Sequence, residues 1–180
     1  MRVIAGKYKG RVLTEFELSS TRPTTDLVKE ALFDKIGLDI VDSICLDLFA
    51  GTGALGIEAL SRNAKFCYFV DQEQNAIKII KKNIALVKAE NIQILNLSFD
   101  KALAHFYKEN KKFDFVFLDP PYKTDFAEKA IEFIFANGIL SQDGLIVWEH
   151  DKSKLDYIKN KFMAAKTKKY GQKYLTYIYS

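Results

Sequence analysis

The sequence predicts an α/β fold, with one domain built on a mostly parallel β-sheet and helices on both faces. Short apolar runs typical of buried strands alternate with amphipathic helical stretches through the middle of the chain. A glycine-rich turn at residues 50–56 joins the first of these runs to a helical stretch. Two strand-like runs lie next to each other at the end, so one strand should be antiparallel. A length of 180 residues favours a single domain over residues 1–180.

The composition is ordinary for a globular protein, with 48% hydrophobic and 28% charged residues. No apolar run approaches the roughly 18 residues of a membrane-spanning helix, and the N-terminal residues lack the apolar core of a signal peptide. Cys45 and Cys67 lie in strand-like runs and are expected to be buried free thiols. The two histidines form no ligand spacing with them, so no metal site is expected. We therefore expect a cytoplasmic protein with no membrane partner.

Charge is distributed unevenly along the chain, whose formal net charge is +4. Residues 1–11 carry a charge of +4 and residues 151–180 a charge of +6, so the segment between them carries −6. Basic ends on an acidic body favour a polyanionic partner. The alternative is that the lysines only solvate exposed helix faces.

The chain opens with a predicted β-hairpin in the basic segment at residues 1–20. Residues 2–5 and 11–14 would form its strands and residues 6–10 its tip, which has a glycine at each end. The tip is basic and carries a tyrosine, so Lys7, Lys9 and Arg11 are candidate contacts to phosphates and bases. A plain surface hairpin is the alternative.

A helix is predicted over residues 26–36, with Thr24 or Thr25 as its N-cap. The polar loop before it and the helix dipole are suited to orient a ligand near Arg22 and Thr24, although a capping role without a ligand explains these residues equally well. The expected apolar stripe of the helix is Leu27, Val28, Ala31, Leu32 and Ile36.

A cofactor loop is predicted at residues 50–56, between a strand at 44–49 and a helix that follows. Glycines there would let the backbone approach a ligand closely, with the helix N-terminus facing it. The next strand, at residues 66–70, ends on Asp71, about twenty residues after Gly51. A carboxylate at that spacing binds ribose hydroxyls in nucleoside-binding folds.

The remaining elements follow in alternation. We expect further helices at residues 72–87, 125–137 and 154–163, and one that ends near residue 107. We expect further strands at residues 92–97, 113–118, 145–149, 164–169 and 174–179. Asp100 is a further acid at a strand end and a candidate site residue, with a helix N-cap as the alternative.

The segment Asp119-Pro120-Pro121-Tyr122 follows the strand at 113–118. Proline cannot donate to a sheet ladder, so the backbone must turn at the carboxyl end of the strand, where open α/β sheets bind ligands. The carboxylate and the adjacent carbonyls accept hydrogen bonds, and the tyrosine ring offers a stacking surface. This corner suits an exocyclic amine of a nucleobase. The alternative is a simple strand end with the tyrosine packed on the core.

These motifs together resemble the RsmD family of 16S rRNA guanine-N2 methyltransferases, within the Rossmann-like S-adenosylmethionine-dependent class. The resemblance rests on residues 47–53 and 119–122, on the segment 22–33, and on the basic residues 4–11. It implies a seven-stranded sheet whose last strand is antiparallel, and a cofactor, S-adenosylmethionine. The cofactor residues that it implies are Arg22, Thr24, Asp47, Phe49, Gly51, Gly53, Asp71, Gln72, Phe99 and Asp100.

The resemblance also assigns roles within this site. Asp47, Gly51 and Gly53 would lie along the methionine part of the cofactor, and Arg22 and Thr24 near its carboxylate. Asp71 would accept from the ribose hydroxyls, and Phe99 and Asp100 would meet the adenine. Asp119, Pro120 and Tyr122 would form the catalytic corner that holds the target base. Lys7, Lys9 and Arg11 would contact the RNA.

The expected function is methylation of the exocyclic N2 of one guanine, guanine-966 by resemblance, in 16S rRNA of the small ribosomal subunit or an assembly intermediate. The protein is expected to act as a monomer. An adenine-N6 DNA or RNA methyltransferase would use the same corner, but a DNA enzyme usually has a separate target-recognition region, for which this chain has no length. A nicotinamide dehydrogenase would not explain the corner, and a non-catalytic RNA-binding module would not need an intact cofactor loop.

Overall fold

A seven-stranded sheet forms the centre of the computed structural model, which describes residues 1–16, 23–121 and 124–180, with the side chains of residues 23–25 excepted. The strands run in the order β3-β2-β1-β4-β5-β7-β6. Their bounds are β1 (Ile44–Asp47), β2 (Phe66–Asp71), β3 (Ile92–Asn96), β4 (Phe113–Leu118), β5 (Leu140–His150), β6 (Lys166–Tyr170) and β7 (Lys173–Tyr179).

Five of these strands are parallel to one another along the sheet, from β3 to β5, and β7 is antiparallel to both of its neighbours, β5 and β6. This confirms the predicted mostly parallel sheet with an antiparallel last strand. The strand order reverses between β1 and β4, because β1 leads to β2 on one side while β4 lies on the other. Ligands of open α/β sheets bind outside the carboxyl ends of the strands at such a point.

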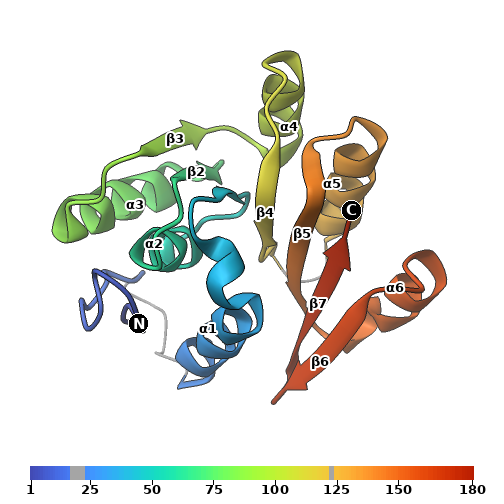
Figure 1. Cartoon of the computed structure of the whole chain (residues 1–180), viewed down its shortest axis with the longest axis horizontal. Helices are drawn as coiled ribbons and strands as arrows, with labels where there is room; N and C mark the ends of the chain where they lie inside the picture. Colours follow the sequence, from blue (N-terminus) through green and yellow to red (C-terminus); the bar gives the residue numbers. More distant parts are fainter. Residues whose placement is uncertain (17–22, 122–123) are drawn as a thin grey trace.

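Helices cover both faces of the sheet (Figure 1). The helices α1, α2 and α3 pack against one face and α4, α5 and α6 against the other. Their bounds are α1 (Pro23–Ile36), α2 (Ala54–Ser61), α3 (Gln74–Val87), α4 (Phe99–Lys108), α5 (Phe126–Ala136) and α6 (Leu155–Lys161), with short 3₁₀ turns η1 (Gly37–Ile40) and η2 (Lys152–Lys154). No helix among the described residues is long and apolar enough to cross a membrane.

The core forms two layers because successive side chains of a strand point to opposite faces. Phe115 and Phe117 of β4 pack against the α1–α3 layer, whereas Val116 and Leu118 pack against the α4–α6 layer. Cys45 and Cys67 are buried and free, as predicted, and burial raises the pKa of the Cys45 thiol to about 12. Both thiols are therefore inert core residues.

Helix α1 departs from the prediction at its start and on one face. It begins at Pro23, three residues before the predicted start, so Thr24 and Thr25 lie within its first turn and are not its N-cap. Proline suits the first helical position, where its missing N–H would have no partner. Leu27 is 58% exposed, and the buried face of the helix contains Val28, Leu32, Phe33 and Ile36.

The N-terminal hairpin is confirmed, although its pairing reduces to one antiparallel bridge between Arg2 and Val12. It is held against α2 by hydrogen bonds that its main-chain amides donate. The Lys7 amide donates to the Ser61 carbonyl at 2.8 Å, and the two carboxylate oxygens of Glu58 accept from the amides of Ile4 and Ala5 at 2.8 and 3.0 Å. The hairpin is therefore fixed to the helix that follows the predicted cofactor loop.

Gly6 shows how close this approach is. Its φ is +81°, and a Cβ at this position would lie 1.8 Å from the carbonyl oxygen of Ser61. Only glycine fits, both because of the positive φ and because backbone lies where a side chain would begin.

Candidate active site

The glycine loop turns the chain sharply from β1 into α2 at the carboxyl ends of β1 and β2. Gly51 and Gly53 both have positive φ, +53° and +79°, which favours glycine at each. Gly53 is the N-cap residue of α2 and supplies no side chain, so the helix N-terminus stays open to the loop. A Cβ on Gly56 would lie 2.3 Å from the Phe69 ring, so this third glycine allows α2 to pack closely on β2.

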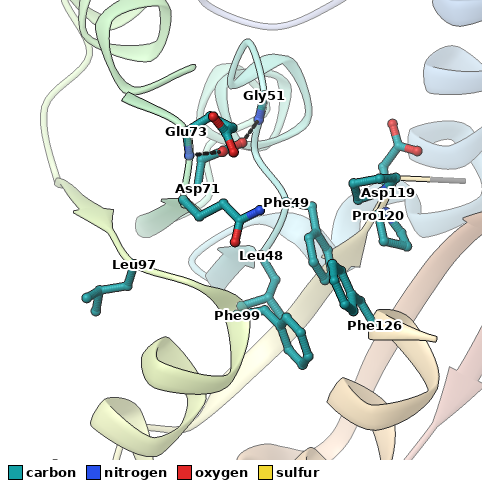
Figure 2. Close-up of a pocket in the computed structure, with 12 residues that line it drawn as sticks. Leu48, Phe49, Gly51, Asp71, Glu73, Leu97, Phe99, Asp119, Pro120 and Phe126 are labelled. Carbon is teal, nitrogen blue, oxygen red and sulfur yellow. Dashed lines mark hydrogen bonds between the residues drawn. The ribbon is translucent and has the colours of Figure 1, made fainter. Parts of the chain in front are cut away.

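Asp71 connects the end of β2 to this loop. Its carboxylate accepts a hydrogen bond from the Gly51 amide at 2.8 Å and another from the Glu73 amide at 2.9 Å, as Figure 2 shows. The side-chain amide of Asn96 donates to the carbonyls of Asp71 and Gln72 at 3.0 and 2.9 Å. These bonds hold the carboxylate toward the loop and leave it further lone pairs for hydroxyl donors.

A cavity of about 270 Å³ adjoins Asp71. Three aromatic rings lie close together at this cavity (Figure 2). The ring centroids are 5.7 Å apart between Phe49 and Phe99 and 5.0 Å apart between Phe99 and Phe126. A carboxylate beside flat apolar walls suits a nucleoside, whose ribose needs acceptors and whose base needs stacking surfaces. The lining is Leu48, Phe49, Gly51, Asp71, Gln72, Glu73, Leu97, Phe99, Asp119, Pro120, Pro121 and Phe126.

A second cavity, of about 250 Å³, shares Phe49, Gly51 and Asp119 with the first and lies toward α1. Its lining adds Asp47 of β1, Glu149 of β5 and Lys29 of α1. The two cavities thus meet at the glycine loop and at the carboxyl end of β4. One can hold a nucleoside while the other holds a polar tail and a second reactant.

Burial governs the charges of the second cavity. Asp47 is 2% exposed and accepts from the Gly56 amide at 3.0 Å, yet burial raises the pKa of its carboxyl to about 7. Lys29 is 3% exposed, and its ammonium donates to the Arg2 carbonyl at 2.5 Å. Burial lowers the pKa of Lys29 below its usual 10.5.

Asp119 stands where the two cavities meet. Asp119 is exposed at the cleft, but the protein around its carboxyl group partly removes that group from water. This desolvation raises the pKa of Asp119 above its usual 3.8; nearby Glu149 and Asp47 raise it further, and Lys173 opposes them. Three carboxylates near one point make the cavity favourable for a cationic ligand.

Seven residues predicted from the sequence line the first cavity, and one more, Asp47, lines the second. The seven are Phe49, Gly51, Asp71, Gln72, Phe99, Asp119 and Pro120. Asp100 is different. It lies in the first turn of α4, is exposed, lines neither cavity, and has a pKa lowered mainly by a hydrogen bond with the Ser98 side chain. The N-cap of α4 is Ser98, so the alternative role for Asp100 as the N-cap is wrong. Arg22, Tyr122 and the side chain of Thr24 lie outside the described residues.

Sequence reasoning missed Lys29, Glu149 and Phe126. Glu149 carries the signal that marked the other acids, a carboxylate at the end of a buried strand, and could have been found by it. Lys29 lies on a helix among residues of mixed polarity, where nothing local distinguishes it from a solvated lysine. No group of three or more metal-binding side chains occurs among residues 1–16, 23–121 and 124–180.

Comparisons with known proteins agree with this arrangement. The model of the family described as Conserved hypothetical protein 95 matches residues 1–179. A Haemophilus influenzae protein named ribosomal RNA small subunit methyltransferase D is 40% identical over 156 residues, which cover 86% of this chain and 80% of that protein.

Solved structures share the fold over nearly the whole chain. The Escherichia coli yhhF structure is 33% identical, has a TM-score of 0.84, and is matched over 100% of this chain and 98% of its own. A Thermus thermophilus structure, titled as the 16S rRNA N2 G1207 methyltransferase RsmC in complex with AdoMet and guanosine, has a TM-score of 0.72 at 22% identity. The match covers 92% of this chain and 45% of that one, and it shows the fold alone.

Proposed function

The chain belongs to the RsmD family, whose family model is described as Conserved hypothetical protein 95, and on that premise we propose that it methylates the exocyclic N2 of one guanine in 16S rRNA. The cofactor is S-adenosylmethionine. The nucleotide is guanine-966 by family resemblance, in the small subunit or an assembly intermediate, and the enzyme acts as a monomer in the cytoplasm.

One observation carries the proposal, the meeting of two cavities at Asp119 and the glycine loop. The adenosine part of the cofactor fits the aromatic cavity, with its ribose hydroxyls donating to Asp71. The methionine part would then extend past Gly51 toward Asp47, whose carboxyl pKa burial raises to about 7. The ammonium of the methionine part would stabilise the ionised form of that carboxyl group. This route places the methyl group beside Asp119.

Placement accounts for much of the chemistry, because the sulfonium methyl is already a strong electrophile. The amine must lie about 3–3.5 Å from the methyl carbon and in line with the carbon–sulfur bond. A bond forms between N2 and the methyl carbon, the carbon–sulfur bond breaks, and its electron pair stays on sulfur. The nitrogen, now positively charged, loses a proton to the surrounding water.

The corner at residues 119–122 prepares the amine for this attack. A guanine N2 is a poor nucleophile because its lone pair conjugates with the ring. Accepting its two N–H groups at the Asp119 carboxylate and the Pro120 carbonyl weakens that conjugation and stabilises the positive charge that develops. Tyr122 is proposed to hold the base by stacking, once the base has left its RNA stack.

Methyl transfer with product identification tests the proposal. The purified protein is incubated with labelled S-adenosylmethionine and under-methylated small subunits, naked 16S rRNA or DNA, and the modified nucleoside is identified by mass. We expect N2-methylguanosine at one position of 16S rRNA. N6-methyladenosine would retain the mechanism but assign the chain to the adenine-N6 alternative, and transfer to none of the three would remove the nucleic-acid function.

The N-terminal hairpin gives a second test. Lys7, Lys9 and Arg11 are exposed on the N-terminal hairpin, which is hydrogen-bonded to α2. Replacing all three with alanine should reduce the slope of log K against log salt by about 2, since each phosphate contact to single-stranded RNA contributes roughly 0.7. RNA affinity across a salt series measures this.

The matched control removes three exposed lysines from α3, namely Lys78, Lys81 and Lys82. It changes the net charge equally but alters a surface with no assigned role. Equal salt slopes for the two triple variants would show that the hairpin makes no specific contact with the RNA and is a plain surface hairpin.

A further inference from the structure

Three charged residues lie at the ends of adjacent strands, on the side of the sheet that carries the site. Leu118 of β4 pairs with Trp148 of β5, so the residues that follow them, Asp119 and Glu149, lie side by side. Glu149 in turn pairs with Leu175 of β7, two residues after Lys173. The order across the sheet is therefore Asp119, Glu149, Lys173.

Their side chains share one face of the sheet. Leu118 and Trp148 point into the α4–α6 layer, so Asp119 and Glu149 point the opposite way, toward α1. Leu175 lies in the α1–α3 layer, and Lys173, two residues before it, faces the same side. Glu149 and Asp119 both line the second cavity.

Glu149 is held in place and is not used by the mechanism above. Its carboxylate is hydrogen-bonded and ion-paired with the Lys173 ammonium, and the two side chains are only 11% and 13% exposed. It also lines a small pocket beside Pro120 and Pro121. An acceptor thus stands immediately next to the corner that receives the target amine.

We propose that Glu149, positioned by Lys173, selects guanine by accepting the N1–H of the target base while Asp119 accepts an N2–H. This inference rests on the proposed function. Guanine presents the N1–H donor directly beside its N2 amine, so two neighbouring carboxylates complement that edge. Adenine has a lone pair at N1, which would face the Glu149 carboxylate, and a buried acceptor without a donor is strongly unfavourable.

A base analogue isolates this contact. 2-Aminopurine keeps the amine that receives the methyl group but carries no hydrogen at N1 and no oxygen at C6. The N1 contact is therefore read from the change of the ratio in Glu149 variants, since the loss of O6 is common to all of them. RNA with guanine or 2-aminopurine at the target position is assayed, and the ratio of the two kcat/KM values is the readout. We expect the wild-type ratio to favour guanine by about 10²-fold, the usual effect of losing one hydrogen bond to a buried charged group.

Glu149→Gln should lower this ratio to about 10 or less, because the amide can donate to the analogue's N1 lone pair. Lys173→Gln, which frees the carboxylate to turn, should lower it by a smaller amount. Glu128→Gln is the matched control. Glu128 is 14% exposed and also pairs with a lysine, Lys154, but lines neither cavity. Melting temperature and S-adenosylmethionine affinity establish that each variant is folded.

Two results with the Glu149→Gln variant would overturn the inference while leaving the proposed function standing. One is an unchanged ratio in Glu149→Gln that still binds the cofactor normally. The other is an unchanged ratio with weakened cofactor affinity, which would assign Glu149 to the methionine ammonium. Wild-type protein that methylates guanine RNA and analogue RNA equally also removes only the inference, whereas wild-type protein that methylates no guanine removes both.

Discussion

Replacing Asp119 with alanine is expected to lower the rate of methyl transfer by about 10²- to 10³-fold, which is typical for loss of one preorganised group at a developing charge. Asp119 lines both cavities. Under the proposed function its carboxylate faces the amine, whereas other residues contact the ribose and the adenine. Affinity for S-adenosylmethionine should therefore stay within about threefold of wild type. Single-turnover transfer to 16S rRNA and calorimetric cofactor titration measure the two quantities.

Asp119→Asn should fall between wild type and alanine, because the amide keeps one acceptor but loses the charge that stabilises the product cation. The control is Asp125→Ala, a nearby exposed aspartate whose carboxylate pairs with Lys129 at 2.8 Å. Near-full turnover of Asp119→Ala, with unchanged cofactor affinity, would falsify the mechanism.

The same carboxylate should impose a pH dependence. Only the ionised form both accepts the N–H hydrogen bond and stabilises the positive charge that develops on the nitrogen. The rate should therefore rise with pH and level off above the pKa of Asp119. Desolvation, Glu149 and Asp47 raise that pKa and Lys173 lowers it, with a net increase above 3.8. The acid limb should therefore lie at higher pH than for an ordinary aspartate, and Asp119→Ala should lack it.

Local pattern predicted the strands well where burial on both faces made the sequence unambiguous. The strand at residues 113–118 coincides with β4, because its apolar run is bounded by lysines on one side and by the two prolines on the other. Strand β5 begins at Leu140, five residues before the predicted start. Leu140 pairs with Phe113 of β4, and pairing then resumes with Leu145 opposite Phe115 after a shift in register. The residues between them, including Asp143 and Gly144, have the composition of a turn and form an irregularity within the strand.

Acids at strand ends marked part of the site in the sequence, beside the residues of the glycine loop. Asp47, Asp71 and Asp119 share that signal, and all three line a cavity. Contacts between distant segments carry no such mark. Asn83 of α3, for example, donates to the carbonyl of Thr14 at 3.0 Å and to that of Thr52 at 2.9 Å, which links the hairpin to the glycine loop. A buried asparagine on a helix does not reveal those partners.

Glu58→Ala is expected to lower the free energy of unfolding by about 3–5 kcal/mol, the usual effect of removing one partner from a buried ionic network. Glu58 is fully buried. It accepts from two hairpin amides and from the Arg62 guanidinium at 3.0 Å, and its carboxylate lies 3.6 Å from the Lys29 ammonium. Alanine would leave these donors buried without their acceptor. For a chain of this length we expect Tm to fall by about 10 °C.

The loss should also loosen the hairpin specifically, since its attachment to α2 depends on those two amides and on Ser61. Limited proteolysis within residues 1–16 should therefore accelerate more than cleavage elsewhere, and RNA affinity should fall even at temperatures where the domain stays folded. Glu30→Ala, an exposed glutamate on α1, is the control and should change stability by less than about 0.5 kcal/mol. If Glu58→Ala lowered the free energy of unfolding as little as Glu30→Ala, the hairpin would be held by its own pairing. Glu58 would then not couple the N-terminal hairpin to α2.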